Sequence, residues 1–197
     1  MGLKPLAGAA LIAALGLAAQ ADPLRIATYS PDLSRDGPGL LLRDLGRTGK
    51  KADPQIAAVV QVIAETRPDI LLLTDFDWDY EGRALAAFTA LLAEAGLDYP
   101  HRFAARPNAG MATDLDLNAD GRQNTADDAQ GFGEFPGQGG MAILSRHPIG
   151  PVTEYTDALW RDLPGNLMPP LPEDVTAARR LSSAVHWDAT ITVANRP

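Results

Sequence analysis

The sequence predicts a mixed α/β fold, because two kinds of apolar pattern alternate along it. Residues 24–29 alternate and are rich in β-forming side chains, which indicates a first strand. Residues 70–74 form a continuous apolar run, typical of a strand buried on both faces. Segments 54–66 and 84–95 carry apolar residues at helical spacing. The order strand, helix, strand, helix implies α/β layering.

Capping residues predict where the helices begin and end. Asp53 is placed as an N-cap with Pro54 in the first turn, and Pro68 predicts that the first helix ends before it. Gly96 stands where a glycine is expected past the C-terminus of the second helix. A short helix is also expected at 40–45, inside a long loop.

The rest of the chain is predicted to be mostly loop with two further strands. Residues 106–138 are polar and glycine-rich, and residues 157–177 are irregular with several prolines. Residues 141–145 form a short apolar strand, and residues 181–193 alternate like a strand.

Composition places the chain among globular proteins and excludes some chemistries. Of 197 residues, 46% are hydrophobic and 21% charged, which fits one ordinary folded domain. The absence of cysteine excludes disulfides, a catalytic thiol and a thiolate metal site. A net charge of −8 opposes tight, non-specific nucleic-acid binding. It does not exclude a nuclease, since metal ions can supply local positive charge.

Residues 1–21 have the pattern of a secretory signal peptide. Lys4 precedes the apolar run 6–19, and Ala19-Gln20-Ala21 fits the small-x-small rule for cleavage. A membrane anchor is the alternative, but the run is shorter than the ~20 residues that a spanning helix needs. We therefore expect export to the periplasm or medium, no membrane anchor after cleavage, and a mature domain at 22–197.

Three segments together carry a recognisable order of motifs. They are 25–30 (RIATYS), 67–75 (RPDILLLTD) and 139–149 (GGMAILSRHPI). In order and spacing they resemble the endonuclease/exonuclease/phosphatase superfamily. That family has a first strand ending in Trp-Asn or a variant, a strand preceded by Pro-Asp and ending in a metal-binding Glu, and a later Gly-x-Ala-Ile-Leu-Ser-Arg strand. The resemblance covers about residues 24–193 and implies the N-terminal portion of a four-layer α/β/β/α sandwich.

The resemblance also implies a catalytic metal site at Ser30 and Asp75, holding Mg²⁺ or a similar divalent ion. Ser30 stands where the family usually has Asn, and Asp75 where it has Glu. A carboxylate directly past a buried strand is held on a rigid element, which suits a metal ligand. The alternative is that Asp75 is a turn residue or a helix cap. Asp77 and Asp79 are expected to be solvated loop acids, although either could join the metal site.

The family's second half supplies an Asp-x-Asn pair and a late Asp-His pair that includes the general base. Neither His147 nor His186 stands in such a context, so we expect both to be structural. The chain is expected to end before the catalytic base and to lack turnover by itself.

A second metal motif lies in residues 116–127. Oxygen-bearing side chains stand at loop positions 1, 3, 5, 9 and 12, with glycine at position 6 for the sharp turn, and the spacing resembles the calcium loop of EF-hand and dockerin modules. The predicted Ca²⁺ ligands are Asp116, Asn118, Asp120, the backbone carbonyl of Arg122, Asn124 and Asp127. A polar loop without metal is the alternative.

Two functions follow from these motifs. The first is an exported, metal-dependent phosphoesterase that hydrolyses a phosphodiester or phosphomonoester by metal-assisted attack of water. The second is a non-catalytic, calcium-ordered binding module outside the cytoplasm.

Overall fold

The computed structural model describes residues 23–193, so the predicted signal peptide at 1–21 lies outside the described residues. The strands are β1 (Ile26–Tyr29), β2 (Ile70–Phe76), β3 (His101–Phe103), β4 (Gly140–Ser145), β5 (Ile149–Glu154) and β6 (Trp187–Ile191). The α-helices are α1 (Leu40–Leu45), α2 (Pro54–Thr66), α3 (Arg83–Glu94) and α4 (Glu173–Ala178). Single 3₁₀ turns occur at η1 (Gly49–Lys51), η2 (Ala126–Asp128) and η3 (Trp160–Asp162).

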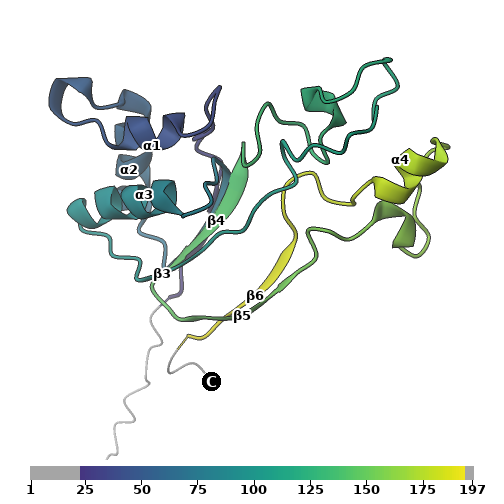
Figure 1. The fold of residues 1–197 in the computed structure, drawn as a ribbon. Helices are drawn as coiled ribbons and strands as arrows, with labels where there is room; N and C mark the ends of the chain where they lie inside the picture. The colour runs from purple at the N-terminus through teal and green to yellow at the C-terminus, as the bar shows by residue number, and fades with distance from the viewer. Residues whose placement is uncertain (1–22, 194–197) are drawn as a thin grey trace, which may run out of the picture.

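Two sheets are present. The larger has the order β1-β2-β4-β3, in which β1 and β2 are parallel and the other pairs antiparallel. The smaller is the antiparallel pair β5-β6. Helices α1, α2 and α3 gather on one side of the larger sheet, whereas β5 and β6 lie apart from them on the other side (Figure 1). The mixed α/β prediction is confirmed.

The core fills the space between the three helices and the larger sheet. Alternate residues of β2 and β4 face this core, because Leu71 pairs with Leu144 and Leu73 with Ala142, and all four are buried. The opposite face of the sheet is more open. Ile26 on β1 is 69% exposed there, while the Phe103 ring meets Trp187 of β6 edge-on at 5.0 Å between centroids.

The helices with a strong apolar period were predicted correctly. Helix α2 begins after Asp53, whose side chain accepts hydrogen bonds from the N–H groups of Gln55 and Ile56 at 2.8 and 3.2 Å. Helices α1 and α3 lie within a residue of their predicted bounds. Gly96 follows α3 with a φ of +79°, a conformation that glycine adopts without strain.

Short elements were missed. Strand β3 has three residues, β5 contains Gly150 and Pro151, and α4 has six residues, so none carries a full apolar period. The strand expected at 181–193 is wrong in extent, because β6 covers only Trp187–Ile191 and His186 lies before it.

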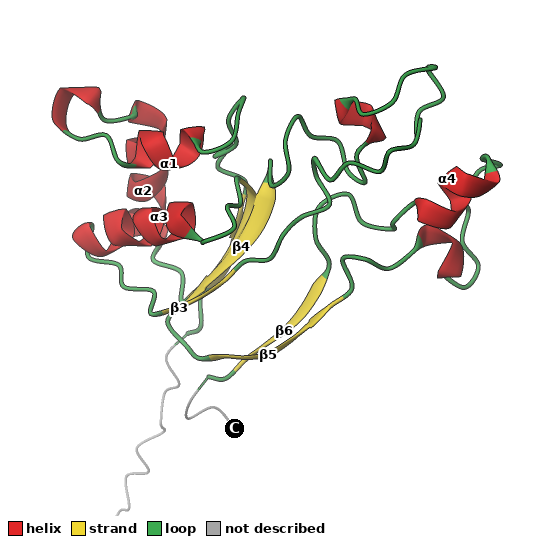
Figure 2. Ribbon diagram, viewed as in Figure 1, coloured by secondary structure: helices red, strands yellow, loops and turns green. Residues whose placement is uncertain are grey.

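Two long loop regions extend from the sheets, on the side away from α1, α2 and α3 (Figure 2). They are fastened to each other by Asn108, which is fully buried. Its amide donates to the carbonyl oxygens of Thr156 and Ser182 at 2.7 and 2.6 Å, and its Oδ1 accepts from Arg180 at 2.6 Å. This bonding gives the segment before β4 and the segment before β6 a fixed relation. A bilayer-spanning helix, which needs both length and an apolar sequence, is not found within residues 23–193.

Phe88 should be the most costly side chain to truncate in this core. It is fully buried and its ring lies 5.7 Å from that of Phe76. Phe88→Ala is expected to lower the free energy of unfolding by about 3–5 kcal/mol, measured by urea denaturation, because the deletion leaves a cavity. Ile26→Thr is the control and should stay within about 0.5 kcal/mol of wild type, since Ile26 is mostly exposed. Equal losses in both variants would contradict the placement of the core.

Candidate active site

Asp75 occupies a β-bulge within β2. Thr74 pairs with Met141, and Phe76 pairs with Gly140, the neighbour of Met141. Asp75 therefore has no partner on β4 and is the extra residue of the bulge. Its φ of 55° lies in the left-handed region, which is uncommon for a residue other than glycine. A bulge re-aims the side chain that it carries. The sequence predicted this carboxylate in the loop after the strand, whereas it belongs to the strand itself.

Asp32 lies beside Asp75, and the sequence analysis did not identify it. The chain after β1 continues along β2, where Leu33 forms a parallel bridge with Phe76. The N–H of Leu33 donates to the carbonyl oxygen of Asp75 at 2.9 Å, and the N–H of Asp77 donates to that of Leu33 at 3.0 Å. Asp32, also in the left-handed region with φ 54°, is thereby held next to Asp75. The only feature of the sequence that could have pointed to Asp32 is that it lies two residues after Ser30.

The pKa of Asp75 is raised by its surroundings. Burial raises it above its usual value, and the charge of Asp32 and a hydrogen bond between the two side chains raise it further.

The absence of a side chain at Gly139 makes space for the Asp75 carboxylate. A Cβ atom at position 139 would lie 3.1 Å from Oδ1 of Asp75, and the glycine has a φ of +58°. The carboxylate opens into a hollow of about 350 Å³. The hollow is lined by Ser34, Asp75, Ala109, Phe132, Gln138, Gly139, Ser183 and Ala184.

Ser30, the other predicted catalytic residue, stands at the same end of the sheet. It follows Tyr29, whose register partner on β2 is Leu73, two residues before Asp75. Its side chain is exposed and does not line the Asp75 hollow. The structure thus puts Ser30 near the site and Asp32 beside Asp75, although Asp32, like Ser30, is exposed and does not line the hollow.

Asp77 is not the solvated loop acid that the sequence predicted. It is only 6% exposed, and it accepts hydrogen bonds from the Ser34 hydroxyl and from the N–H groups of Arg35 and Gly139 at 2.9, 2.9 and 3.1 Å. Burial raises the pKa of Asp77, and these donors partly offset the increase. The prediction failed because three donors converge from segments distant in sequence. Asp77 fastens the loop after β1 to the start of β4.

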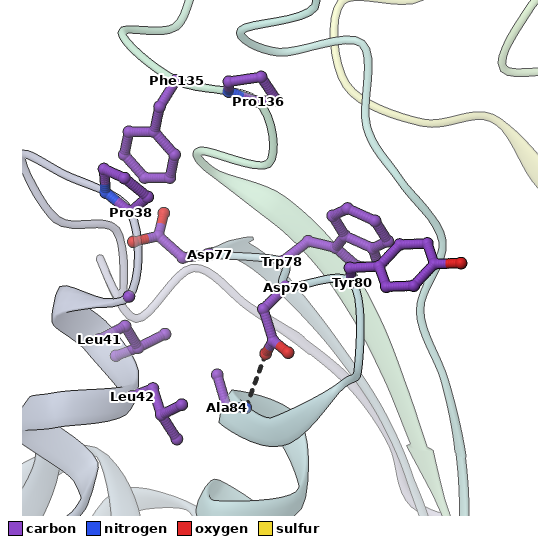
Figure 3. A pocket seen from close by; sticks show the side chains of 11 residues that line it. Pro38, Leu41, Leu42, Asp77, Trp78, Asp79, Tyr80, Ala84, Phe135 and Pro136 are labelled. Carbon is purple, nitrogen blue, oxygen red and sulfur yellow. Dashed lines mark hydrogen bonds between the residues drawn. The ribbon is translucent and has the colours of Figure 1, made fainter.

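Asp79 acts at the start of α3. Its two oxygens accept from the N–H groups of Glu81, Arg83 and Ala84 at 3.2, 2.8 and 2.7 Å. Figure 3 shows the bond to Ala84 at the edge of a smaller hollow of about 260 Å³. In that view the Trp78 and Tyr80 rings lie together, on the side away from Leu41 and Leu42. Since its acidic residues are already committed to backbone donors, this hollow is not the candidate active site.

The Asp75 site fits a divalent cation by its donor chemistry. Mg²⁺ takes oxygen ligands, usually one or two carboxylates with water and substrate oxygens in the remaining positions. Asp75 and Asp32 supply two carboxylates, and Gly139 leaves the space beside one of them open. Larger clusters are not involved, because residues 23–193 contain no group of three or more Asp, Glu, His or Cys side chains that could hold a metal.

The 116–127 loop is coiled in its first half. Asp116 accepts from the N–H groups of Asp120 and Gly121 at 3.1 and 2.8 Å, Asn118 accepts from that of Asp120 at 3.1 Å, and Asp120 accepts from that of Arg122 at 2.8 Å. Gly121 has the positive φ that the sharp turn requires, at 82°. The predicted ligands at 116, 118 and 120 therefore lie on a single turn of the chain.

The second half of the loop is closed by Asp128, which the motif did not include. Asp128 is buried, and it accepts from the N–H groups of Leu117 and Thr125 and from the Thr125 hydroxyl at 2.8, 3.0 and 2.8 Å. Asp127 lies in η2 with an exposed side chain, and together with Asn124 it lines a separate hollow. The pKa of Asp128 is lowered, chiefly by its hydrogen bonds with Thr125.

Comparison with known proteins gives a family and one related structure. A family model described as the endonuclease/exonuclease/phosphatase family matches residues 36–193. Among solved structures, the chain is similar to an endonuclease/exonuclease/phosphatase from Beutenbergia cavernae DSM 12333, at 20% identity and a TM-score of 0.39. The match covers 73% of this chain and 31% of that one, so the chain spans about a third of that protein. The search of curated proteins gave no match.

Stability should depend on Asp128 in a pH-dependent way. The folded-state pKa is depressed, so its contribution is full above the ordinary carboxyl value of 3.8 and is lost as the pH falls through the folded value. Asp128→Asn should therefore be less stable than wild type at pH 7, and the difference should shrink below about pH 4. Urea denaturation at several pH values measures both, in the absence of calcium.

Asp127→Asn provides the control, because that side chain is exposed. It should leave the calcium-free stability close to wild type. A stability difference for Asp128→Asn that stays constant down to pH 3 would show that its charge is not involved.

Proposed function

The chain belongs to the endonuclease/exonuclease/phosphatase family, and we propose that Asp75 and Asp32 hold a divalent metal ion for the hydrolysis of a phosphate ester. The family assignment suggests a hydrolase acting on phosphate esters. The position of Asp32 beside Asp75, set by the Leu33 backbone hydrogen bond, is the observation that carries the metal proposal, because it concentrates negative charge at the end of β2.

The physical argument is electrostatic. Neighbouring carboxylates repel each other, and the charge of Asp32 adds to the increase in the Asp75 pKa that burial chiefly causes. A divalent cation between them would convert the repulsion into attraction and keep both groups ionised. Mg²⁺ or a similar ion would polarise a phosphoryl oxygen and lower the pKa of a bound water. Asp75 holds its direction because the bulge and the Leu33 hydrogen bond fix its backbone.

The role of Ser30 is smaller in this proposal than in the family pattern. Its hydroxyl lies after the end of β1, where it would form a hydrogen bond with a water molecule bound to the ion. Asp32 takes the nearer position. An anionic oxygen from Asp32 then compensates for the missing Asn at position 30 and for the shorter side chain at position 75.

A general base for the attacking water does not come from the histidines of this chain. His101 lies on β3, His147 follows β4 and His186 precedes β6, and none of the three lines the hollow of Asp75. The His186 ring packs instead against the Tyr155 ring, with 5.4 Å between the ring centroids. None of these three histidines is therefore placed to act as the base in this hollow.

The second candidate function is a calcium-ordered binding module, and the coiled 116–122 turn favours it. We propose Ca²⁺ at the side chains of Asp116, Asn118 and Asp120, which the first turn brings together, and at the carbonyl of Arg122. The other two predicted ligands, Asn124 and Asp127, line a separate hollow and would have to turn towards the ion. Calcium would order the long segment before β4, which also supplies one wall of the Asp75 hollow. Export, proposed from residues 1–21, would expose the loop to the calcium levels at which weak extracellular sites work.

Replacement of Asp75 tests the phosphoesterase proposal. Asp75→Asn and Asp32→Asn should each weaken Mn²⁺ or Mg²⁺ binding in calorimetric titration, because each removes one anionic ligand. If the wild-type chain hydrolyses bis(4-nitrophenyl) phosphate, the rate should fall about 100-fold, since metal polarisation is worth several kcal/mol and ~1.4 kcal/mol is tenfold.

Asp36→Asn is the matched control, since Asp36 is an exposed carboxylate on the same loop as Asp32. It should bind the metal like wild type. If Asp75→Asn bound the ion as tightly as Asp36→Asn, the assigned metal role of Asp75 would be refuted.

Calcium should raise the melting temperature of the full chain. Binding to the folded state stabilises by RT ln(1 + [Ca²⁺]/Kd), so a ~0.1 mM site at 10 mM calcium gives about 2.7 kcal/mol. Differential scanning fluorimetry measures the shift, which Asp116→Ala should abolish. Asp114→Ala, an exposed acid outside the motif, should leave it intact. The absence of any shift at 10 mM calcium in the wild type would remove the site.

A further inference from the structure

Phe132 is exposed beside the candidate active site. Its side chain is 67% exposed, although it is among the most hydrophobic residues of the chain. It lines the same hollow as Asp75, together with Gln138 and Ser183. A single exposed apolar side chain is ordinary on a protein surface. Its position in the lining of this hollow, on a backbone that is held on both sides, calls for an explanation.

The backbone around Phe132 is held by close contacts at the glycines that flank it. A Cβ at Gly131 would lie 1.8 Å from the carbonyl oxygen of Ser183, and a Cβ at Gly133 would lie 2.6 Å from the backbone nitrogen of Gly110. Gly110 also donates to the Gly131 carbonyl at 2.9 Å, and the Gly131 N–H donates to that of Asn108 at 3.1 Å. These contacts leave the loop little room to fold Phe132 into the core. The ring is therefore presented to solvent by a constrained backbone.

The lining of the hollow limits what could meet this ring. Asp75 is its only charged residue, and the other side chains are small, amide or hydroxyl groups. Lysine and arginine, which neutralise the phosphates of a polymer, are absent from this lining. The volume of about 350 Å³ is at the small end of ligand sites. Such a hollow suits one uncharged ring beside one phosphate group.

We propose that Phe132 stacks on a planar aromatic ring in the alcohol part of the substrate and so determines specificity for ring-bearing phosphate esters. This inference rests on the proposed function, because Asp75 and its metal ion would hold the phosphate. An aromatic side chain and a planar ring gain from offset stacking, and a puckered aliphatic ring of equal size does not gain in the same way. Phe132 is thus a specificity-determining residue that touches the substrate without joining the chemistry.

The test compares a planar and a puckered ligand of the same size. The full chain with Mg²⁺ is titrated calorimetrically with phenylphosphonate, cyclohexylphosphonate and inorganic phosphate, none of which can be turned over. Wild type should bind phenylphosphonate most tightly. Phe132→Leu keeps an apolar side chain but removes the ring, so it should weaken phenylphosphonate roughly five- to hundredfold and change cyclohexylphosphonate less than twofold. Phe132→Trp should restore the preference.

Tyr80→Leu is the matched control, because Tyr80 is an aromatic residue that is 91% exposed and lies outside the Asp75 hollow. It should leave all three affinities unchanged. The melting temperature of Phe132→Leu should equal that of wild type, since the ring contributes little to the core. Equal weakening of both phosphonates, or no weakening of either, would overturn the stacking proposal.

Failure of the two proposals can be told apart. If inorganic phosphate binds with Mg²⁺ but phenylphosphonate binds no more tightly, the phosphate site stands and the stacking role is wrong. If none of the three ligands binds to wild type in the presence of Mg²⁺, the proposed phosphate site fails, and the stacking proposal fails with it.

Discussion

The arrangement of the candidate site depends on the backbone pairing between Leu33 and the end of β2. Leu33 is completely buried, donates to the carbonyl of Asp75 and accepts from Asp77. This short extension of the sheet puts Asp32 beside Asp75 and directs the Asp77 side chain towards Ser34, Arg35 and Gly139. The apolar burial of one leucine therefore fixes the positions of three acidic side chains. Without it, carboxylates that repel one another would separate into solvent.

The loops round the site gain their order from backbone contact instead of side-chain packing. At Gly110, Gly131 and Gly137 a Cβ atom would collide with a backbone carbonyl oxygen at 1.9, 1.8 and 2.4 Å. Asn108 adds buried bonds to Thr156 and Ser182, which join the segments before β4 and β6. Glycine thus allows long irregular segments to pack at a distance that other residues would prevent. The walls of the Asp75 hollow are built from these segments.

The acidic groups of the chain divide into two kinds. Some accept hydrogen bonds or form ion pairs within the chain. Asp128 closes the 116–127 loop, and Asp79 accepts from the first N–H groups of α3. Asp44 forms ion pairs with Arg35, Arg43 and Arg47. Burial alone would raise the pKa of Asp44, but its hydrogen bonds to Arg43 and Arg35 lower it overall. Asp75 and Asp32 are of the other kind, since they face each other. The proposed Mg²⁺ site lies at this second kind of carboxylate.

The sequence by itself determined the elements whose patterns are local. Helix α2 follows from Asp53, Pro54 and its apolar period, and β2 from a continuous apolar run, so the end of β2 and Asp75 could be located without a structure. The first turn of the 116–127 loop followed from spacing in the same way. Tertiary structure alone decided that Asp75 sits on a bulge, that Asp32 joins it, that Asp77 is buried and that Phe132 borders the same hollow. These facts depend on contacts between segments that lie tens of residues apart, and no local pattern in the sequence encodes which segments meet.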